Sequence, residues 1–186
     1  MSFALVLLAI PVIALLVFVL IYNALVQARN HCDEAWADID AELKRRYDLI
    51  PNLVRTVQGY AKHEREVFEG VSQARAAAMA NNGSPASQAR DENQLIRGLR
   101  QLLAVAEGYP DLKANKNFLA LQTELANTED RIQRSRRFYN ANVRDYQNRL
   151  QVFPSNLVAG AFNFPPREFF EIEDASEREA PAVQSV

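Results

Sequence analysis

The sequence predicts an all-α protein in which an N-terminal transmembrane helix continues into an antiparallel bundle of about four long helices with coiled-coil-like packing. Three observations predict it. Residues 1–28 contain no charged side chain, whereas the rest of the chain carries all 21 Lys and Arg and all 23 Asp and Glu. Apolar residues then recur at spacings of three and four, as on one face of a helix. The 8 prolines and 6 glycines leave long uninterrupted intervals, which favours helices over short strands.

Residues 1–22 are predicted to form the membrane anchor. The segment from Phe3 to Tyr22 is uncharged, and as a helix it would span about 30 Å, the thickness of the hydrocarbon core of a bilayer. Pro11 is compatible with a spanning helix. A cleavable signal peptide would need a basic segment at its start and a shorter apolar run, so we expect the anchor to be retained.

The basic residues predict the orientation of the anchor. None precedes the apolar segment, while Arg29 and the run from Lys44 to Arg46 follow it. Lys and Arg accumulate on the cytoplasmic side of spanning helices. We therefore expect a single-pass membrane protein, with its N-terminus outside and its helical domain in the cytoplasm.

Residues 23–152 are predicted to form the helical bundle. A first helix over 23–50 continues from the anchor, and Pro51 should kink or break it because proline lacks a backbone N–H group. A second helix would cover 51–80. Two seven-residue repeats support coiled-coil-like packing across this boundary: Trp36, Leu43, Ile50 and Val57, and Ile39, Arg46, Leu53 and Tyr60.

Two further helices complete the bundle. Ser84 followed by Pro85 is a helix start signal, and this third helix should end near Gly108. The last helix should run from about residue 117 to residue 151, since apolar residues step by three and four along it. These patterns place Leu53 and Leu125 in the core, and they predict that a negative charge at Gln88 costs little.

The C-terminal part divides into two segments. Residues 153–170 are loop-like but aromatic, which predicts docking onto the bundle or onto a neighbouring subunit. The phenylalanines concerned are Phe153, Phe162, Phe164, Phe169 and Phe170. Residues 171–186 are acidic and weakly apolar, which is typical of a tail that is mobile by itself.

Composition argues against several function classes. A net charge of −2 and a pI near 5.8 argue against nucleic acid as a partner. One cysteine, Cys32, excludes an intrachain disulfide and a multi-cysteine zinc site. The segment from His63 to Val67 begins like a zinc-protease helix but lacks the second histidine. We expect no metal, no cofactor and no enzymatic activity.

Two basic clusters admit two interpretations each. Lys44–Arg46 could contact anionic lipid, but a solvated or partner-facing role is favoured because an upright helix places it about 33 Å beyond Tyr22. The arginines from Arg131 to Arg137 form either an exposed helix face or a site for carboxylates of the acidic tail or a neighbouring subunit.

Six segments resemble the LemA family, in the order that the family has them. They are AWADID (35–40), KRRYDLIPNLV (44–54), GYAKHEREVFEGV (59–71), LLAVAEGYPDLKANKNFLALQTEL (102–125), TEDRIQRSRRFYN (128–140) and FPSNLVAGAF (153–162). The resemblance implies a bacterial membrane protein with one N-terminal helix and a cytoplasmic bundle. It supplies no agreed activity, although a related protein takes part in magnetosome membrane formation and family members are associated with membrane proteases and stress.

We therefore expect a membrane-anchored, non-enzymatic scaffold that self-associates and organises membrane proteins or membrane shape. The alternative is an adaptor or regulator of a membrane protease or envelope-stress system. The expected partners are the lipid bilayer, further copies of the chain and other membrane proteins. Cys32 should form a disulfide between subunits if the juxtamembrane helices pair. The residues expected at the oligomer or partner interface are Leu25, Cys32, Trp36, Ile39, Arg131, Arg134, Arg137, Phe162, Phe164, Phe169 and Phe170.

Overall fold

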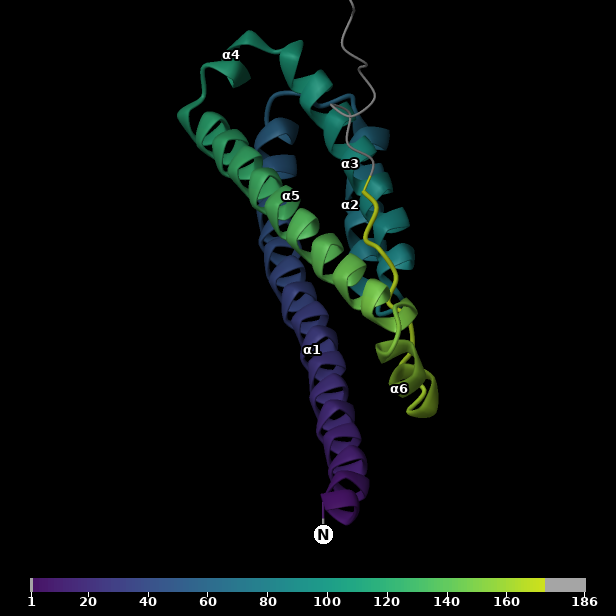
Figure 1. Ribbon diagram of the computed structural model, residues 1–186. Helices are drawn as coiled ribbons and strands as arrows, with labels where there is room; N and C mark the ends of the chain where they lie inside the picture. Colours follow the sequence, from purple (N-terminus) through teal and green to yellow (C-terminus); the bar gives the residue numbers. More distant parts are fainter. Residues whose placement is uncertain (1, 173–186) are drawn as a thin grey trace, which may run out of the picture. The chain divides into compact units, whose positions relative to one another are not determined.

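The computed structural model describes residues 2–172, and in this range the chain forms six helices and no strand (Figure 1). The all-α prediction is confirmed. The helices are α1 (Ser2–Gln58), α2 (Arg65–Ala80), α3 (Pro85–Glu107), α4 (Pro110–Lys113), α5 (Lys116–Gln151) and α6 (Ser155–Ala161). All of the predicted acidic tail except residues 171 and 172 lies outside the described residues.

The chain forms two compact units. The first unit contains α1 up to Asp40, α5 from Arg134 onward, α6 and the extended segment up to Glu168. The second unit contains Ala41–Gln133 and, of the remaining described residues, Phe169–Ile172. Both long helices, α1 and α5, thus contribute residues to each unit.

The predicted break at Pro51 is wrong, because α1 continues through this proline to Gln58. A proline at this position leaves the carbonyl of Tyr47 without its usual donor four residues later. The structure supplies another donor, since Nε of Arg75 in α2 lies 2.6 Å from the Tyr47 carbonyl oxygen. A side chain of the neighbouring helix thus replaces the missing N–H group.

If Arg75 replaces the missing N–H group, the stability cost of substituting Arg75 should depend on whether residue 51 is proline. Arg75→Met should lower the free energy of unfolding by about 1–3 kcal/mol, because it leaves the Tyr47 carbonyl without a partner. In a Pro51→Ala background the alanine N–H can occupy the carbonyl, and the same substitution should cost clearly less. The measurement is a double-mutant cycle from urea unfolding of the full-length protein in mild detergent. Equal costs in both backgrounds would contradict the replacement.

The break in the helix comes instead after Gln58. The N–H groups of Tyr60 and Ala61 both donate to the carbonyl of Val57, at 3.0 and 2.9 Å, which closes a turn. Ala61 is fully buried and holds this turn against the rest of the unit. The predicted second helix is therefore divided between the end of α1 and α2. Val71 and Ala78, which continue the predicted seven-residue repeat, are buried in α2.

The starts of α3 and α5 follow from local sequence. The Ser84 hydroxyl accepts a hydrogen bond from the N–H of Ser87 at 3.4 Å, which confirms the predicted start of α3. Asn115 caps α5 in the same way, and its Oδ1 lies 2.9 Å from the N–H of Asn117. The short helices α4 and α6 were not predicted.

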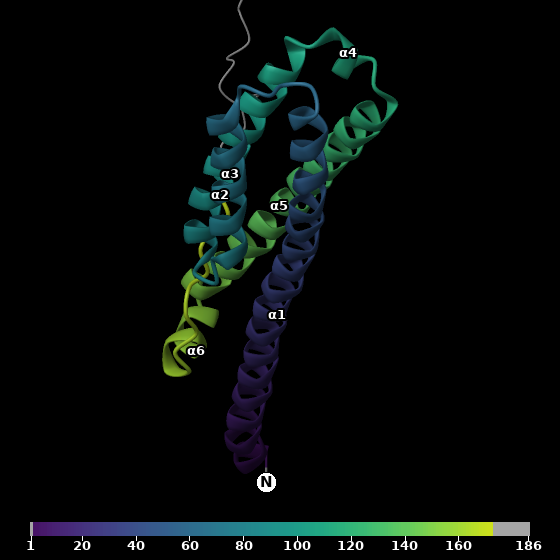
Figure 2. The same cartoon turned by 180° about the vertical axis from the view of Figure 1, so that it is seen from behind.

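The second unit has an apolar core drawn from α1, α2, α3 and α5. Leu53 and Leu125 lie in it as predicted. Helices α2 and α3 lie side by side (Figure 2), and Gly98 permits their close approach, because a Cβ atom there would lie 3.2 Å from Cγ2 of Val71. The expectation for Gln88 is wrong, since this side chain is buried rather than exposed.

The first unit has its own core. It includes Leu25, Ala28, Cys32, Ala35 and Ile39 of α1, Tyr139, Val143 and Tyr146 of α5, and Val158 and Ala159 of α6. The apolar stripe that would be exposed on a lone juxtamembrane helix is therefore buried within the same chain. Residues 153–170 are not simply a loop, because they contain α6 before the chain becomes extended.

Candidate functional site

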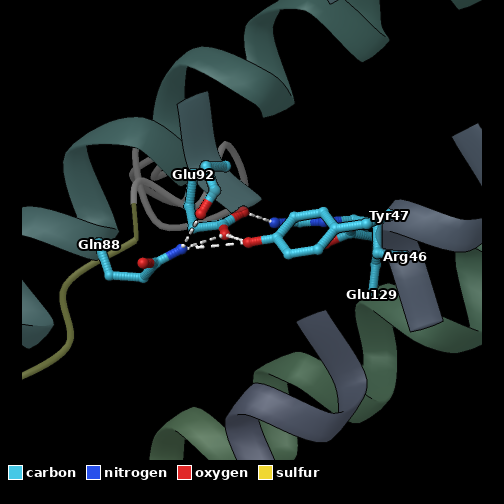
Figure 3. A network of polar contacts seen from close by, with 6 residues as sticks. Arg46, Tyr47, Gln88, Glu92 and Glu129 are labelled. Carbon is cyan, nitrogen blue, oxygen red and sulfur yellow. Dashed lines mark hydrogen bonds and ion pairs between the residues drawn. The ribbon is translucent and has the colours of Figure 1, made fainter. Parts of the chain in front are cut away.

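A fully buried arginine, Arg46, lies at the centre of the second unit. It occupies an apolar position of the heptad repeat in α1 and has no solvent exposure. Its Nη1 donates to Oε1 of Glu129 in α5 at 2.7 Å, and its Nη2 pairs with Oε2 of Glu92 in α3 (Figure 3). One guanidinium therefore connects three helices through two carboxylates.

The carboxylate of Glu92 is also fully buried, and its second oxygen has two further donors. The hydroxyl of Tyr47 donates to Oε1 of Glu92, and Nε2 of Gln88 lies 2.9 Å from the same oxygen. Nε2 of Gln88 also lies 3.0 Å from the carbonyl oxygen of Ala78, at the end of α2. We call Arg46, Tyr47, Gln88, Glu92 and Glu129 the Arg46 cluster (Figure 3).

The electrostatics of the Arg46 cluster keep its arginine charged. Burial of the guanidinium lowers the pKa of Arg46, but the carboxylates of Glu129 and Glu92 outweigh burial, so the pKa is raised overall. General acid–base chemistry requires contact with a substrate, and neither Arg46 nor Glu92 is exposed. The geometry favours a structural role, in which the cluster sets how α1, α3 and α5 align.

The cluster removes one residue from the basic run in α1. Because Arg46 is buried, it cannot face lipid or solvent as part of a Lys44–Arg46 patch, whereas Lys44 and Arg45 are exposed. Sequence reasoning placed Arg46 in the apolar repeat but did not pair it with an acid. Glu92 and Glu129 lie 46 and 83 residues away, so no local spacing indicates the pairing.

The predicted arginine interface on α5 divides into internal and exposed residues. Arg131 binds Glu42 of α1 at 2.9 Å and Glu124 at 3.1 Å, so its partners lie in its own chain. Arg136 is buried, whereas Arg134 and Arg137 are exposed. The acidic tail that was considered as their partner lies outside the described residues.

The predicted juxtamembrane interface is largely internal in the structure. Leu25, Cys32 and Ile39 are each at most 1% exposed, and Trp36 is half-buried with its ring 5.3 Å from that of Tyr139. Burial raises the pKa of the Cys32 thiol, and the side chain is closed to a second subunit. The expected intersubunit disulfide at Cys32 is therefore incompatible with this packing.

An extended segment after α6 binds along α5. The hydroxyls of Tyr146 and Tyr139 donate to the carbonyls of Pro165 and Glu168 at 2.9 and 2.8 Å, and Nε2 of Gln147 donates to the carbonyl of Arg167 at 2.6 Å. Burial raises the pKa of Tyr139 to about 12, so its hydroxyl stays protonated and keeps donating. The segment thus docks on its own chain, one of the two predicted outcomes.

The aromatic residues of this region differ in exposure. Phe170 is fully buried, and Phe164 and Phe169 are half-buried. The Phe164 ring lies 5.8 Å from that of Tyr22, and the guanidinium of Arg29 lies 5.6 Å from its centre. Phe162 differs from these three because half of its surface is exposed.

The N-terminal part of α1 is apolar on all sides. Every large apolar side chain described between Ile10 and Leu20 is exposed, and the most apolar window of the helix has a mean hydropathy of 2.6. In the described part of the chain, α1 is the one helix long and apolar enough to cross a membrane. Neither water nor the rest of the described chain accounts for such a surface.

Comparison with known proteins identifies the family, since the profile of the LemA family matches residues 35–184. The chain belongs to the LemA family. This LemA family chain is 30% identical over 139 residues to Protein LemA of Metamycoplasma hominis, covering 74% of the chain and 63% of the relative. It is 24% identical over 181 residues to Magnetosome protein MamQ 1 of Paramagnetospirillum magneticum, covering 84% and 66%. The chain thus spans slightly less than two thirds of these two relatives.

A third relative aligns with a larger share of the chain. Magnetosome protein MamQ of Magnetospirillum gryphiswaldense is 24% identical over 199 aligned positions, which cover 91% of the LemA family chain and 73% of the relative. Together with the exposed apolar part of α1, these relatives indicate a membrane protein. Among the described residues, no group of three or more His, Cys, Asp and Glu side chains could hold a metal ion.

Proposed function

We propose that this LemA family protein is a membrane-anchored, non-enzymatic helical scaffold that self-associates and organises membrane proteins or membrane shape. One observation carries the proposal. Helix α1 runs without a loop from its exposed apolar part to Gln58, and its later turns contain the buried Arg46. The membrane anchor and a core element of the bundle are thus one helix, which suits a protein that holds partners near a membrane.

The burial pattern supports a scaffold over an enzyme. The charged groups that are most tightly packed, Arg46 and Glu92, bind each other across helices and have no exposure. The two MamQ relatives are named magnetosome proteins, which supports a role at a membrane. We place the protein in the bacterial inner membrane with its bundle in the cytoplasm, as the basic residues after the anchor favour.

The exposed face of α5 in the first unit is the proposed site of self-association. Arg134 and Arg137 are exposed there, and Phe138 beside them is 59% exposed. Copies held in one membrane have a high local concentration, so even weak contacts between such surfaces become populated. Arginine and aromatic residues are also enriched in protein interfaces.

The test is the mass of the full-length protein in native lipid particles. We expect a homo-oligomer, and Arg134→Glu with Arg137→Glu should shift it toward the monomer. Arg55→Glu with Arg100→Glu is the charge-matched control, at exposed arginines of the second unit. A monomer for the unmodified protein would reject the scaffold, and equal effects of both pairs would reject this interface.

The alternative function is an adaptor that binds a membrane protease or stress component as a monomer. A surface pocket of about 560 Å³ in the second unit favours it. Phe68 and Ala61 line this pocket together with Lys62, Arg65 and Glu69, and Arg65 pairs with Glu69 at 2.6 Å. Lys62 would be the cation for an apolar segment that carries a carboxylate. A protease co-purifying in fixed ratio with a monomer would support this alternative.

A further inference from the structure

Four large apolar side chains around α6 are exposed. Val152 is 46%, Phe153 78%, Leu157 64% and Phe162 50% exposed. We call these four residues the α6 surface. They lie within residues 150–166, a stretch with no Asp, Glu, Lys or Arg. Such a cluster is costly in water and indicates a surface that something apolar covers.

The opposite face of α6 is bound to the base of the apolar part of α1. Val158 and Ala159 form a buried cluster with Leu25, and Ile21 and Tyr22 pack against that cluster. Helix α6 is therefore held in place beside the end of the apolar segment. Its remaining apolar residues are not needed for this contact.

The α6 surface is continuous with the apolar segment itself. The ring of Phe162 lies 5.7 Å from that of Phe18 and 5.0 Å from that of Tyr22. Phe18 belongs to the exposed apolar turns of α1, which lipid would surround. Whatever covers the α6 surface would therefore lie next to the lipid that surrounds the apolar turns of α1.

An arginine flanks the uncharged stretch 150–166 at each end. Arg149 precedes it and pairs with Asp145 at 2.9 Å, while Arg167 follows it and pairs with Asp33 at 2.5 Å. An apolar surface bordered by arginines matches the boundary between acyl chains and phosphate headgroups.

We propose that residues 152–162 insert into the bilayer interface beside the membrane-spanning part of α1, so that the protein contacts the membrane through two elements. The occupant of the α6 surface is lipid. The inference rests on the membrane anchor of the proposed function. Elements of this kind lie about 5–10 Å deep, at the boundary of headgroups and acyl chains.

The test uses full-length protein in nanodiscs of phosphatidylethanolamine and phosphatidylglycerol that contain lipid with a nitroxide near the headgroup. An environment-sensitive fluorophore is attached at Leu157→Cys or, as a matched control, at Leu119→Cys. Both native residues are exposed leucines, and Leu119 lies near the start of α5, in the second unit. The parent protein provides the blank, because Cys32 is buried.

We expect blue-shifted emission at position 157 and quenching by the nitroxide lipid severalfold stronger than at position 119. Equal quenching at both positions would overturn the proposal. Blue-shifted emission without quenching would also overturn it, because that result identifies a protein rather than lipid as the occupant.

A third probe separates this proposal from the anchor on which it rests. A fluorophore at Leu16→Cys lies within the apolar turns of α1. Its quenching by a nitroxide placed deep in the acyl chains confirms the anchor. If position 16 is quenched and position 157 is not, only the insertion of α6 fails. If neither is quenched, the anchor fails as well.

Discussion

Arg46→Met should lower the free energy of unfolding by about 3–5 kcal/mol, because it leaves the carboxylate of Glu92 buried without a cation. Glu92 has no solvent exposure, so water cannot replace the guanidinium without opening the core. Urea unfolding of the full-length protein in mild detergent measures the effect.

The neighbouring residue supplies the control for this prediction. Arg45→Met removes the same charge from an arginine whose side chain is 53% exposed and should change stability little. Arg46→Met combined with Glu92→Leu should recover much of the loss, because an apolar pair of similar volume can replace a buried ion pair. Similar unfolding midpoints for Arg45→Met and Arg46→Met would contradict the structural role of the cluster.

Leu53→Asp and Leu125→Asp should each destabilise the second unit by several kcal/mol, about the cost of burying an unpaired carboxylate. Leu53 is 2% and Leu125 6% exposed. Leu119→Asp is the matched control, since Leu119 lies on the same helix as Leu125 but is 46% exposed. Thermal unfolding followed by circular dichroism measures all three variants.

A common melting temperature for these three variants would show that the described core is not the one that stabilises the protein. Gln88, which the sequence indicated as a harmless site for a negative charge, is unsuitable as a control. Its side chain is 7% exposed and donates to Glu92, so a carboxylate there would face another carboxylate.

Local signals predicted where several helices begin and end. Ser84 followed by Pro85 marks the start of α3, because a serine side chain can accept a hydrogen bond from a free N–H of the first turn. Regular apolar spacing predicted α5 to within a residue or two of its ends. These features depend on residues a few positions apart, so the sequence alone contains them.

The course of the chain at Pro51 depended on a distant residue. Proline removes a hydrogen bond in any helix, and this local cost predicts a break. The helix continues because Arg75 of α2 donates to the carbonyl that the proline leaves free. Nothing within one turn of Pro51 indicates this compensation.

The sequence by itself determined that the protein is helical, that its N-terminal segment is apolar enough to span a membrane, and that Leu53 and Leu125 belong to a core. Only the tertiary structure decided the partners of Arg46 and Arg131 and the burial of Cys32. Helical periodicity shows which face of a helix is apolar, but it does not show which other helix covers that face. Burial and ion pairing depend on residues dozens of positions apart, and only the folded chain brings those residues together.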